Sequence, residues 1–192
     1  MKNLNWEEAF TIHFDLKNGL AHARKPIQRR LSDMKGMYSD SNSEELLIKE
    51  DNPLIYEYYD LGAPEHPGDL AFGTSIVYPG KVGNEYFMTK GHFHSILETA
   101  EVYYCLRGQG FMLMESPEGD WDTKEMTPGT AVYVPKRYAH RSINTGNEPL
   151  ITFFTFRADA GHDYGTIETN GYKKLLVEID GKTEIIDNPK RK

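Results

Sequence analysis

The stretch that decides the fold is Gly91-His-Phe-His-Ser-Ile-Leu-Glu-Thr-Ala-Glu-Val-Tyr-Tyr-Cys-Leu-Arg-Gly108. Successive side chains of an extended chain point to opposite faces, so His92 and His94 share one side. Glu101 opens a run rich in strand-forming residues, which places Glu101 and Tyr103 on one face of a second strand. The pattern therefore predicts a carboxylate that faces a pair of imidazoles from a neighbouring strand.

A more distant segment supplies a candidate fourth ligand. It reads Gly129-Thr-Ala-Val-Tyr-Val-Pro135-Lys-Arg-Tyr-Ala-His140-Arg-Ser-Ile-Asn144, and we expect His140 to follow a strand and a proline turn. Three imidazoles and one carboxylate suit Fe, Mn, Ni, Co or Zn, with positions left open for water or substrate. For any single histidine, an exposed strand or loop residue is the simpler interpretation. The four residues together favour one metal site.

Composition limits the class of protein. A chain of 192 residues has room for one domain with a substantial core. The single cysteine, Cys105, excludes an internal disulfide and is expected to be a packed thiol. No signal-peptide pattern and no apolar run near the ~18 residues of a spanning helix stands out. We therefore expect a soluble, cytoplasmic protein that does not enter a membrane.

The charge balance argues against nucleic acid as a partner. The formal net charge is -7, and the basic residues are dispersed apart from 25–30 and the tail 190–192. Such a chain lacks the broad positive field that nucleic acids require. A small phosphorylated molecule remains compatible with this charge, because backbone N–H groups, hydroxyls and one or two local cations can hold a phosphate.

Short β-prone runs with turns every eight to twelve residues predict an all-β sandwich or barrel. We expect a single domain over residues 1–192, in which 1–53 form an amino-terminal arm, 54–157 the barrel core, and 158–192 an active-site loop and a hairpin. Within the arm, a hairpin over 11–24 and a short helix capped by Ser43 are predicted. The predicted core strands are 54–59, 70–78, 84–93, 100–106, 109–115, 122–126, 131–134, 141–145 and 149–157. The final hairpin is expected over 172–179 and 183–186.

Two residue spacings in the sequence indicate a protein superfamily. Glu101-x6-Gly108 and Gly129-x5-Pro135-x4-His140-x3-Asn144 resemble the two signature motifs of the cupins, small jelly-roll barrels with a metal inside one end. Arg137 departs from the pattern, since glycine usually stands there, and the gap between the histidine pair and the glutamate is longer than usual.

That longer gap narrows the resemblance to one family. Together with further segments, it makes the chain similar, almost end to end, to the cupin-type glucose-6-phosphate isomerases found mainly in archaea. These segments are Arg29-Arg-Leu-Ser-Asp-Met34, Tyr78-Pro-Gly-Lys-Val-Gly83, Thr89-Lys-Gly-His-Phe-His94, Ala100-Glu-Val-Tyr103, Ala160-Gly-His-Asp-Tyr-Gly-Thr166 and Asp187-Asn-Pro189.

The resemblance implies roles for individual residues. It implies one divalent ion per subunit, Fe(II) foremost and Mn(II), Ni(II), Co(II) or Zn(II) accepted, and a homodimer acting on a sugar phosphate. The implied metal ligands are His92, His94, Glu101 and His140. The implied phosphate residues are Ser75, where the family carries threonine, Thr89 and Gly91. The residues implied to contact the sugar chain and ring oxygen are Tyr103, His162 and Tyr164.

Position 156 departs from the family. The chain has Phe156 where the family has a tyrosine whose hydroxyl helps to bind phosphate. The contact should be missing or supplied by a neighbour such as Arg157 or Thr155. We expect weaker substrate binding rather than loss of the chemistry.

Aldose–ketose isomerisation moves a proton between two adjacent carbons and builds negative charge on their oxygens. Glu101 is the candidate base, and a metal-assisted hydride shift that needs no base is the alternative. His162, with an ordinary pKa of ~6.5, is a candidate for ring opening, and Tyr103 for a hydrogen bond to substrate. Taken alone, His162 is as readily a loop or helix-cap histidine, and Tyr103 is more simply explained as a core tyrosine. Two other functions share the motif: an iron-dependent cupin dioxygenase and a non-catalytic sugar- or metal-binding cupin.

Overall fold

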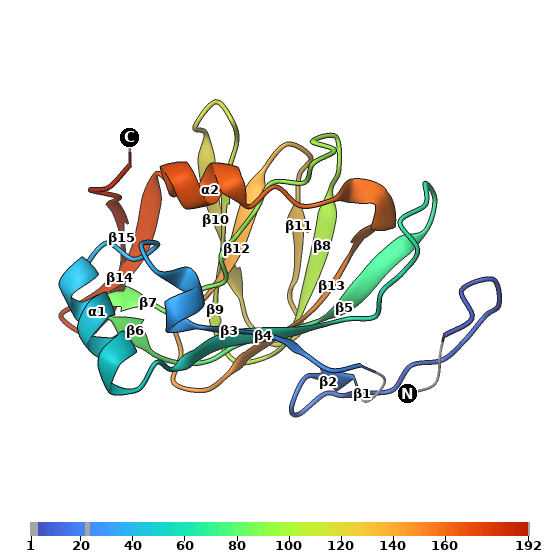
Figure 1. Cartoon of the computed structure of the whole chain (residues 1–192), viewed down its shortest axis with the longest axis horizontal. Coiled ribbons are helices and arrows are strands. Elements are labelled where there is room, and N and C mark those ends of the chain that lie inside the picture. The colour runs from blue at the N-terminus through green and yellow to red at the C-terminus, as the bar shows by residue number, and fades with distance from the viewer. Residues whose placement is uncertain (1–3, 22–23, 192) are drawn as a thin grey trace.

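The computed structural model describes residues 4–21 and 24–191. Two antiparallel sheets face one another: a six-stranded sheet of order β11-β8-β13-β5-β4-β3 and a three-stranded sheet of order β10-β9-β12 (Figure 1). A third sheet, β15-β14-β7-β6, lies at one end, and the small hairpin β1-β2 at the other. The all-β fold of the cupin type is therefore confirmed, although among the described residues the two facing sheets are not joined into one closed ladder.

The bounds of the elements follow the chain in order. The strands are β1 Phe14–Asp15, β2 Leu20–Ala21, β3 Ile27–Arg30, β4 Leu54–Asp60, β5 Leu70–Val77, β6 Lys81–Val82, β7 Glu85–Tyr86, β8 Glu101–Arg107, β9 Gly110–Glu115, β10 Trp121–Met126, β11 Ala131–Val134, β12 Ala139–Asn144, β13 Leu150–Arg157, β14 Lys174–Ile179 and β15 Lys182–Asp187. The α-helices are α1 Ser41–Glu50 and α2 Gly165–Asn170, and 3-10 turns span η1 Leu31–Met34 and η2 Ala158–Ala160.

Most core strands begin and end within one or two residues of the predicted bounds, but the segment 84–93 does not. Only β7 is regular there, and the following residues meet β12 at separate bridges, Met88 with Ile143 and His92 with His140. Four steps along the first segment therefore oppose three along β12, which is the arrangement of a β-bulge. The prediction of a continuous strand was wrong because an extra residue interrupts the pairing next to His92.

His140 also lies elsewhere than predicted. It is the second residue of β12 rather than a residue of the turn before a strand, because β12 begins at Ala139. In this position it pairs with His92 through backbone hydrogen bonds in both directions. The distant histidine is thus fixed by strand pairing.

Helix α1 begins three residues earlier than predicted, and its cap differs. The carboxylate of Asp40 accepts hydrogen bonds from the amides of Asn42 and Ser43, while the hydroxyl of Ser43 donates to the same carboxylate. A charged acceptor next to the positive end of the helix is a stronger cap than the serine three residues further on. The predicted Ser43 cap was wrong.

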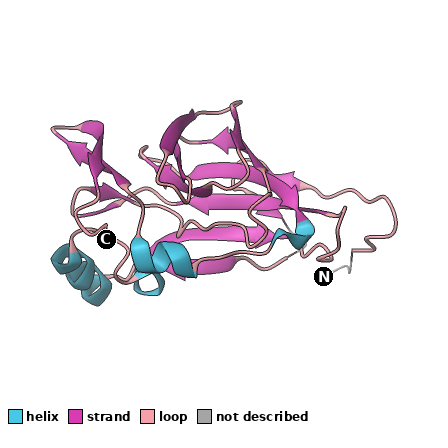
Figure 2. Ribbon diagram, turned by 90° about the horizontal axis from the view of Figure 1, so that it is seen from above, coloured by secondary structure: helices cyan, strands magenta, loops and turns pink. Residues whose placement is uncertain are grey.

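The carboxyl-terminal part combines a predicted hairpin with an unforeseen helix. β14 and β15 pair antiparallel around Asp180-Gly181, as predicted, and β14 also pairs with β7. Helix α2 begins in the expected loop. Of the hairpin predicted over 11–24, the structure shows the short pairing of β1 with β2. Part of its second strand, predicted over 20–24, lies outside the described residues. Both views place the two termini at opposite ends of the molecule (Figures 1 and 2).

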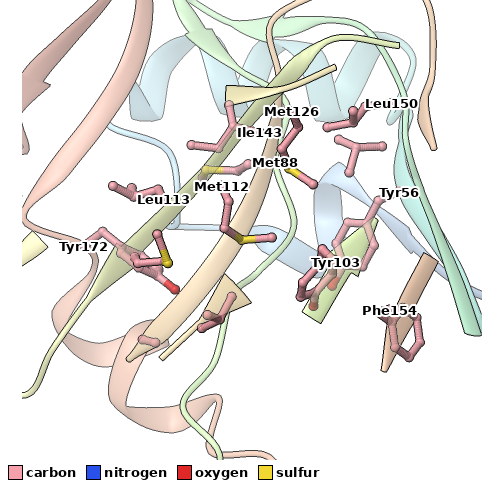
Figure 3. Close-up of a cluster of buried hydrophobic side chains, with 14 of the residues drawn as sticks. Tyr56, Met88, Tyr103, Met112, Leu113, Met126, Ile143, Leu150, Phe154 and Tyr172 are labelled. Carbon is pink, nitrogen blue, oxygen red and sulfur yellow. The ribbon is translucent and has the colours of Figure 1, made fainter. Parts of the chain in front are cut away.

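The interior between the facing sheets is filled over part of its length and hollow over the rest. Aliphatic and methionine side chains such as Met112 and Ile143 are almost fully buried there (Figure 3). Tyr56, Tyr103 and Phe154 belong to the same cluster and also line a cavity. Each buried large apolar side chain contributes about 1.5–3 kcal/mol of burial free energy, so the filled part stabilises the walls of the hollow part.

Candidate metal centre and substrate cavity

Three histidines and one glutamate converge at the inner end of this hollow. The ligand atoms of His92, His94, Glu101 and His140 all lie within 4.8 Å of one another. The Nε2 atoms of His94 and His140 lie 3.1 Å and 2.9 Å from the same carboxylate oxygen, Oε2 of Glu101. The bulged segment, β8 and β12 each contribute to the cluster. The structure therefore brings together all four residues that the sequence singled out.

The hydrogen bonds of this cluster fit a bound cation. Nδ1 of His94 donates to the carbonyl oxygen of Gly161 at 3.2 Å, and Nδ1 of His140 faces the carbonyl oxygen of Tyr138 at 3.4 Å. Each ring thus lies between two acceptors, a carbonyl oxygen at Nδ1 and the carboxylate of Glu101 at Nε2, and a proton on Nδ1 leaves the Nε2 lone pair for a cation. The Nε2 atoms of His92 and His140 are buried without a hydrogen-bond partner in the described chain. Converging acceptors of this kind suit a divalent ion.

The electrostatics of the cluster keep its carboxylate ionised. Burial opposes ionisation of Glu101, but the facing imidazoles of His140 and His94 outweigh it and hold the pKa of the carboxyl well below its usual range. Burial, followed by the carboxylate of Glu101, raises the pKa of Tyr103 well above its ordinary value, so its hydroxyl stays protonated and donates to Glu101. Burial and the neighbouring His140 lower the pKa of His92. The cluster thus contains an anionic carboxylate, Glu101, and a neutral imidazole, His92.

The cluster forms one end of a cavity of about 290 Å³. Every predicted substrate residue lines this cavity: Ser75, Thr89, Gly91, Tyr103, His162 and Tyr164. Three of the four cluster residues line it as well, whereas His94 is 3% exposed and lies behind the wall. The volume lies at the small end of the range for ligand cavities, about 300–1,000 Å³, which suits a molecule of the size of a hexose phosphate.

Two aromatic side chains of the loop before α2 stand at the mouth of the cavity. The ring of His162 lies 4.5 Å from that of His92 between centroids, and it stacks on Tyr164 at 5.8 Å with an interplanar angle of 12°. His162 is exposed to solvent at this mouth. The loss of water around the ring, followed by the effect of the nearby His94, nevertheless lowers the pKa of His162. A largely neutral imidazole therefore stands between the cluster and bulk water.

The two aspartates beside His162 act in turns. Asp159 accepts two hydrogen bonds from Arg157, and Asp163 accepts from the amide and the hydroxyl of Thr166 in the first turn of α2. Neither of these bonds orients the imidazole. Both aspartates therefore stabilise local turns.

Phe156 faces the cavity, 5.2 Å from the ring of His94 between centroids. Its two proposed substitutes do not line the cavity, since strand alternation places Thr155 and Arg157 on the other face of β13. Arg157 is also engaged by Asp159. Neither residue replaces the tyrosine hydroxyl of the family.

Sequence reasoning missed several residues of the wall: Tyr56, Tyr58, Asp60, Glu65, Ser142 and Phe154. The period of a strand could have found most of them. Tyr56, Tyr58 and Asp60 alternate along β4, Ser142 lies two residues from His140, and Phe154 lies two residues from Phe156. Glu65 lies in a loop and carries no such signal.

Fold and site together define the class, an all-β protein of the cupin type with three histidines and a glutamate gathered at one end of a cavity. Residues 28–190 match the family model described as glucose-6-phosphate isomerase (GPI). The chain belongs to this family of isomerases, which confirms the family resemblance inferred from the sequence motifs.

Relatives cover nearly the whole chain. It is 49% identical over 187 residues to a glucose-6-phosphate isomerase of Thermococcus litoralis, covering 97% of this chain and 98% of that protein. A Pyrococcus abyssi protein of the same name is 48% identical, with 97% and 99% covered. A Sinorhizobium medicae protein, also of this name, is 38% identical, with 91% and 83% covered. Among solved structures, an oxalate decarboxylase of Bacillus subtilis aligns with a TM-score of 0.43 at 26% identity, covering 54% of this chain and 26% of that one.

Proposed function

We propose that this chain interconverts glucose 6-phosphate and fructose 6-phosphate, in glycolysis and gluconeogenesis, with the help of one divalent metal ion. The observation that carries the proposal is the cluster of His92, His94, Glu101 and His140 at the end of a hydroxyl-lined cavity, in a chain of this family. A mixed set of imidazoles and one carboxylate suits Fe(II), Mn(II), Ni(II), Co(II) or Zn(II), and the family resemblance puts Fe(II) first.

A bound ion would supply positive charge beside the two substrate oxygens that become negative during isomerisation. The base is Glu101, which is ionised and held in one orientation by the hydroxyl of Tyr103. Its carboxylate takes the proton from C2 of the open-chain sugar and returns it to C1, while the hydroxyl proton of O2 passes to O1, so that the carbonyl group forms at C2. When substrate binds, the hydroxyl of Tyr103 can turn its one proton from Glu101 to a substrate oxygen.

The cavity mouth suits ring opening. His162 lies beside the cluster, open to solvent and with a lowered pKa, so it can exchange a proton with the ring oxygen. Tyr164 stacks on it and fixes its plane. The hydroxyls of Ser75 and Thr89 and the backbone of Gly91 hold the phosphate.

Turnover tests the proposal directly. The protein is stripped with a chelator, reloaded with each of the five ions under anaerobic conditions, and mixed with fructose 6-phosphate, while a coupled dehydrogenase reports glucose 6-phosphate. We expect no turnover after stripping and recovery with at least one ion. Absence of turnover with all five ions would contradict the proposal. Consumption of dioxygen would favour the dioxygenase alternative instead, and binding without turnover the non-catalytic one.

We also propose a homodimer in the cytoplasm, and this rests on the family resemblance. In the described part of the chain, no helix has the length and apolar content that a membrane crossing needs. Light scattering after gel filtration should give twice the mass of the chain, and a monomer mass would contradict the dimer.

A further inference from the structure

Arg141 is a buried cation on the side of β12 that faces away from the cavity. It alternates with His140 and Ser142, which line the cavity, and it is 2% exposed. One terminal nitrogen donates to the sulfur of Met88 at 2.8 Å and the other to the carbonyl oxygen of Lys90 at 2.5 Å. Its guanidinium lies over the ring of Tyr172, 4.3 Å from the centroid. Its surroundings hold it in one place.

This cation has no anionic partner within ion-pair distance among the described residues, although thirteen ion pairs are formed elsewhere in residues 4–21 and 24–191. Its Nε is buried without a hydrogen-bond partner. Glu85, an acid near enough to act on Arg141, has a pKa raised by its own burial, which favours its neutral form. A buried charge without a counter-charge is costly to folding. An anionic ligand that binds the folded protein would offset this cost.

The bulge connects Arg141 to the cavity through one peptide group. The residues on either side of this peptide group are hydrogen-bonded to β12: the amide of Thr89 donates to the carbonyl of Ser142, and the amide of His92 donates to the carbonyl of His140. Between them, the carbonyl of Lys90 accepts from Arg141. The peptide is trans, so the N–H of Gly91 points away from Arg141.

The amide of Gly91 is available to a ligand. Gly91 lines the cavity, and no acceptor within the described residues bonds to its amide. A side chain at this position is excluded twice: φ is +73°, and an added Cβ would lie 2.5 Å from the hydroxyl oxygen of Tyr172. Glycine is therefore required at this position by its backbone angle and by the packing against Tyr172, outside the cavity.

We propose that Arg141 is a positioning residue for the phosphate of the substrate. By holding the Lys90 carbonyl, it aims the N–H of Gly91 into the cavity, and its unpaired charge balances the phosphate dianion from behind the wall. The inference rests on the proposed function for the identity of the ligand, a sugar phosphate. It adds a cation that never touches the ligand to a site otherwise built from hydroxyls and backbone.

The test compares Arg141→Gln with Arg141→Lys and with the control Arg107→Gln, whose arginine is paired with Glu148 at the surface. Calorimetry measures the binding of inorganic phosphate, and kinetics give KM and kcat for fructose 6-phosphate. The hydrogen bond from the Gly91 N–H to a charged phosphate contributes about 1.5–3 kcal/mol, so loss of its alignment in Arg141→Gln should weaken phosphate binding by about tenfold or more and raise KM by a similar factor. We expect kcat to change by less than about threefold, as for a contact made equally before and during reaction.

A merely structural role predicts a different pattern. Loss of fold alone would lower the melting temperature and the active fraction, and the remaining molecules would keep the phosphate affinity of the parent. Equal phosphate affinity in Arg141→Gln and the parent would therefore overturn the inference. If Arg141→Gln does not fold, Arg141→Lys decides. It keeps the charge but cannot stack flat on Tyr172 and reach Lys90 together, so unchanged phosphate affinity in that variant would also overturn it.

Phosphate binding separates this inference from the proposed function. Arg141-dependent binding of phosphate without turnover of fructose 6-phosphate would contradict the isomerase and leave the positioning role standing. Turnover of fructose 6-phosphate together with a phosphate affinity that does not depend on position 141 would support the isomerase and overturn the positioning role.

Discussion

The two faces of β12 differ in charge: one face gathers acceptor groups around a carboxylate, and the other carries a buried cation. On the cavity side, His140 meets two further imidazoles and an ionised carboxylate, so acceptors converge with no cation among the described residues. On the far side, the next residue, Arg141, is a buried cation with no paired anion in the same part of the chain. One strand thus places a negative and a positive site one residue apart. Each deficit predicts its own ligand: a metal ion on one side, and a phosphate, held through the Gly91 peptide, on the other.

The largest effect is expected on the cavity side, from Glu101→Gln. The amide keeps the shape of the side chain but cannot accept the C2 proton, so turnover should fall by about 10²–10⁴-fold. Binding of fructose 6-phosphate, measured by calorimetry, should survive. The matched control is Glu98→Gln, which should keep full activity, because Glu98 is an exposed carboxylate in the loop before β8 and is paired with Lys136. Activity retained in Glu101→Gln would remove its assignment as the base.

The next largest effect is expected from Gly91→Ala, which changes the residue after the Lys90 carbonyl, in the peptide group between the two faces. The added methyl group would meet the hydroxyl oxygen of Tyr172 at 2.5 Å and the carbonyl oxygen of His140 at 3.0 Å. We expect a loss of about 3 kcal/mol in the free energy of unfolding by chemical denaturation. Gly181→Ala is a close control, because Gly181 has the same φ of +73° and no heavy atom within 4 Å of the added Cβ.

This control isolates backbone strain. Gly181→Ala should cost only about 1 kcal/mol, as expected for a left-handed residue without a clash. Equal losses in the two variants would mean that the packing between Gly91 and Tyr172 does not hold the bulge in place.

A smaller gain is expected from Phe156→Tyr. The new hydroxyl would enter the cavity near the phosphate residues and add one donor, so KM for fructose 6-phosphate should fall by about three- to tenfold, at about 1 kcal/mol per hydrogen bond. Phe154→Tyr is the control, because Phe154 lines the same cavity two residues away on β13. An unchanged KM in Phe156→Tyr would show that phosphate binding is already complete without this hydroxyl.

The smallest effect concerns Glu85, near Arg141. Burial raises the pKa of its carboxyl above the ordinary 4.5, so folding favours the protonated acid. Its stabilising contribution is full below pH 4.5 and is lost as the pH rises through the folded-state pKa. Glu85→Gln cannot ionise, so its stability relative to the parent, from denaturant melts at several pH values, should rise with pH. A Glu85 that acted as counter-ion to Arg141 would give the opposite trend.

The cavity side was largely predictable from sequence, whereas the far side was not. Histidine spacing and the Glu101 motif identified the cluster, even though His92 lies in a bulge rather than a strand, because the neighbouring strands fix the ligands regardless of that irregularity. Strand alternation also carries the signal for Tyr56 and Tyr58. The contact of Arg141 with Tyr172 depends on how β12 meets a distant segment, which no local pattern encodes. The prediction of a Ser43 cap failed for a local reason, since Asp40 and Ser43 are both possible acceptors for the same helix end.

The central claim, that the four converging side chains bind one cation, is tested most directly by calorimetric titration of the chelator-stripped protein with Mn(II) and, without oxygen, Fe(II). We predict one ion per chain in the parent, and affinity at least about 100-fold lower in His140→Ala, since a ligand of the ion is removed. No binding in a folded parent, or equal binding in the parent and His140→Ala, would contradict it.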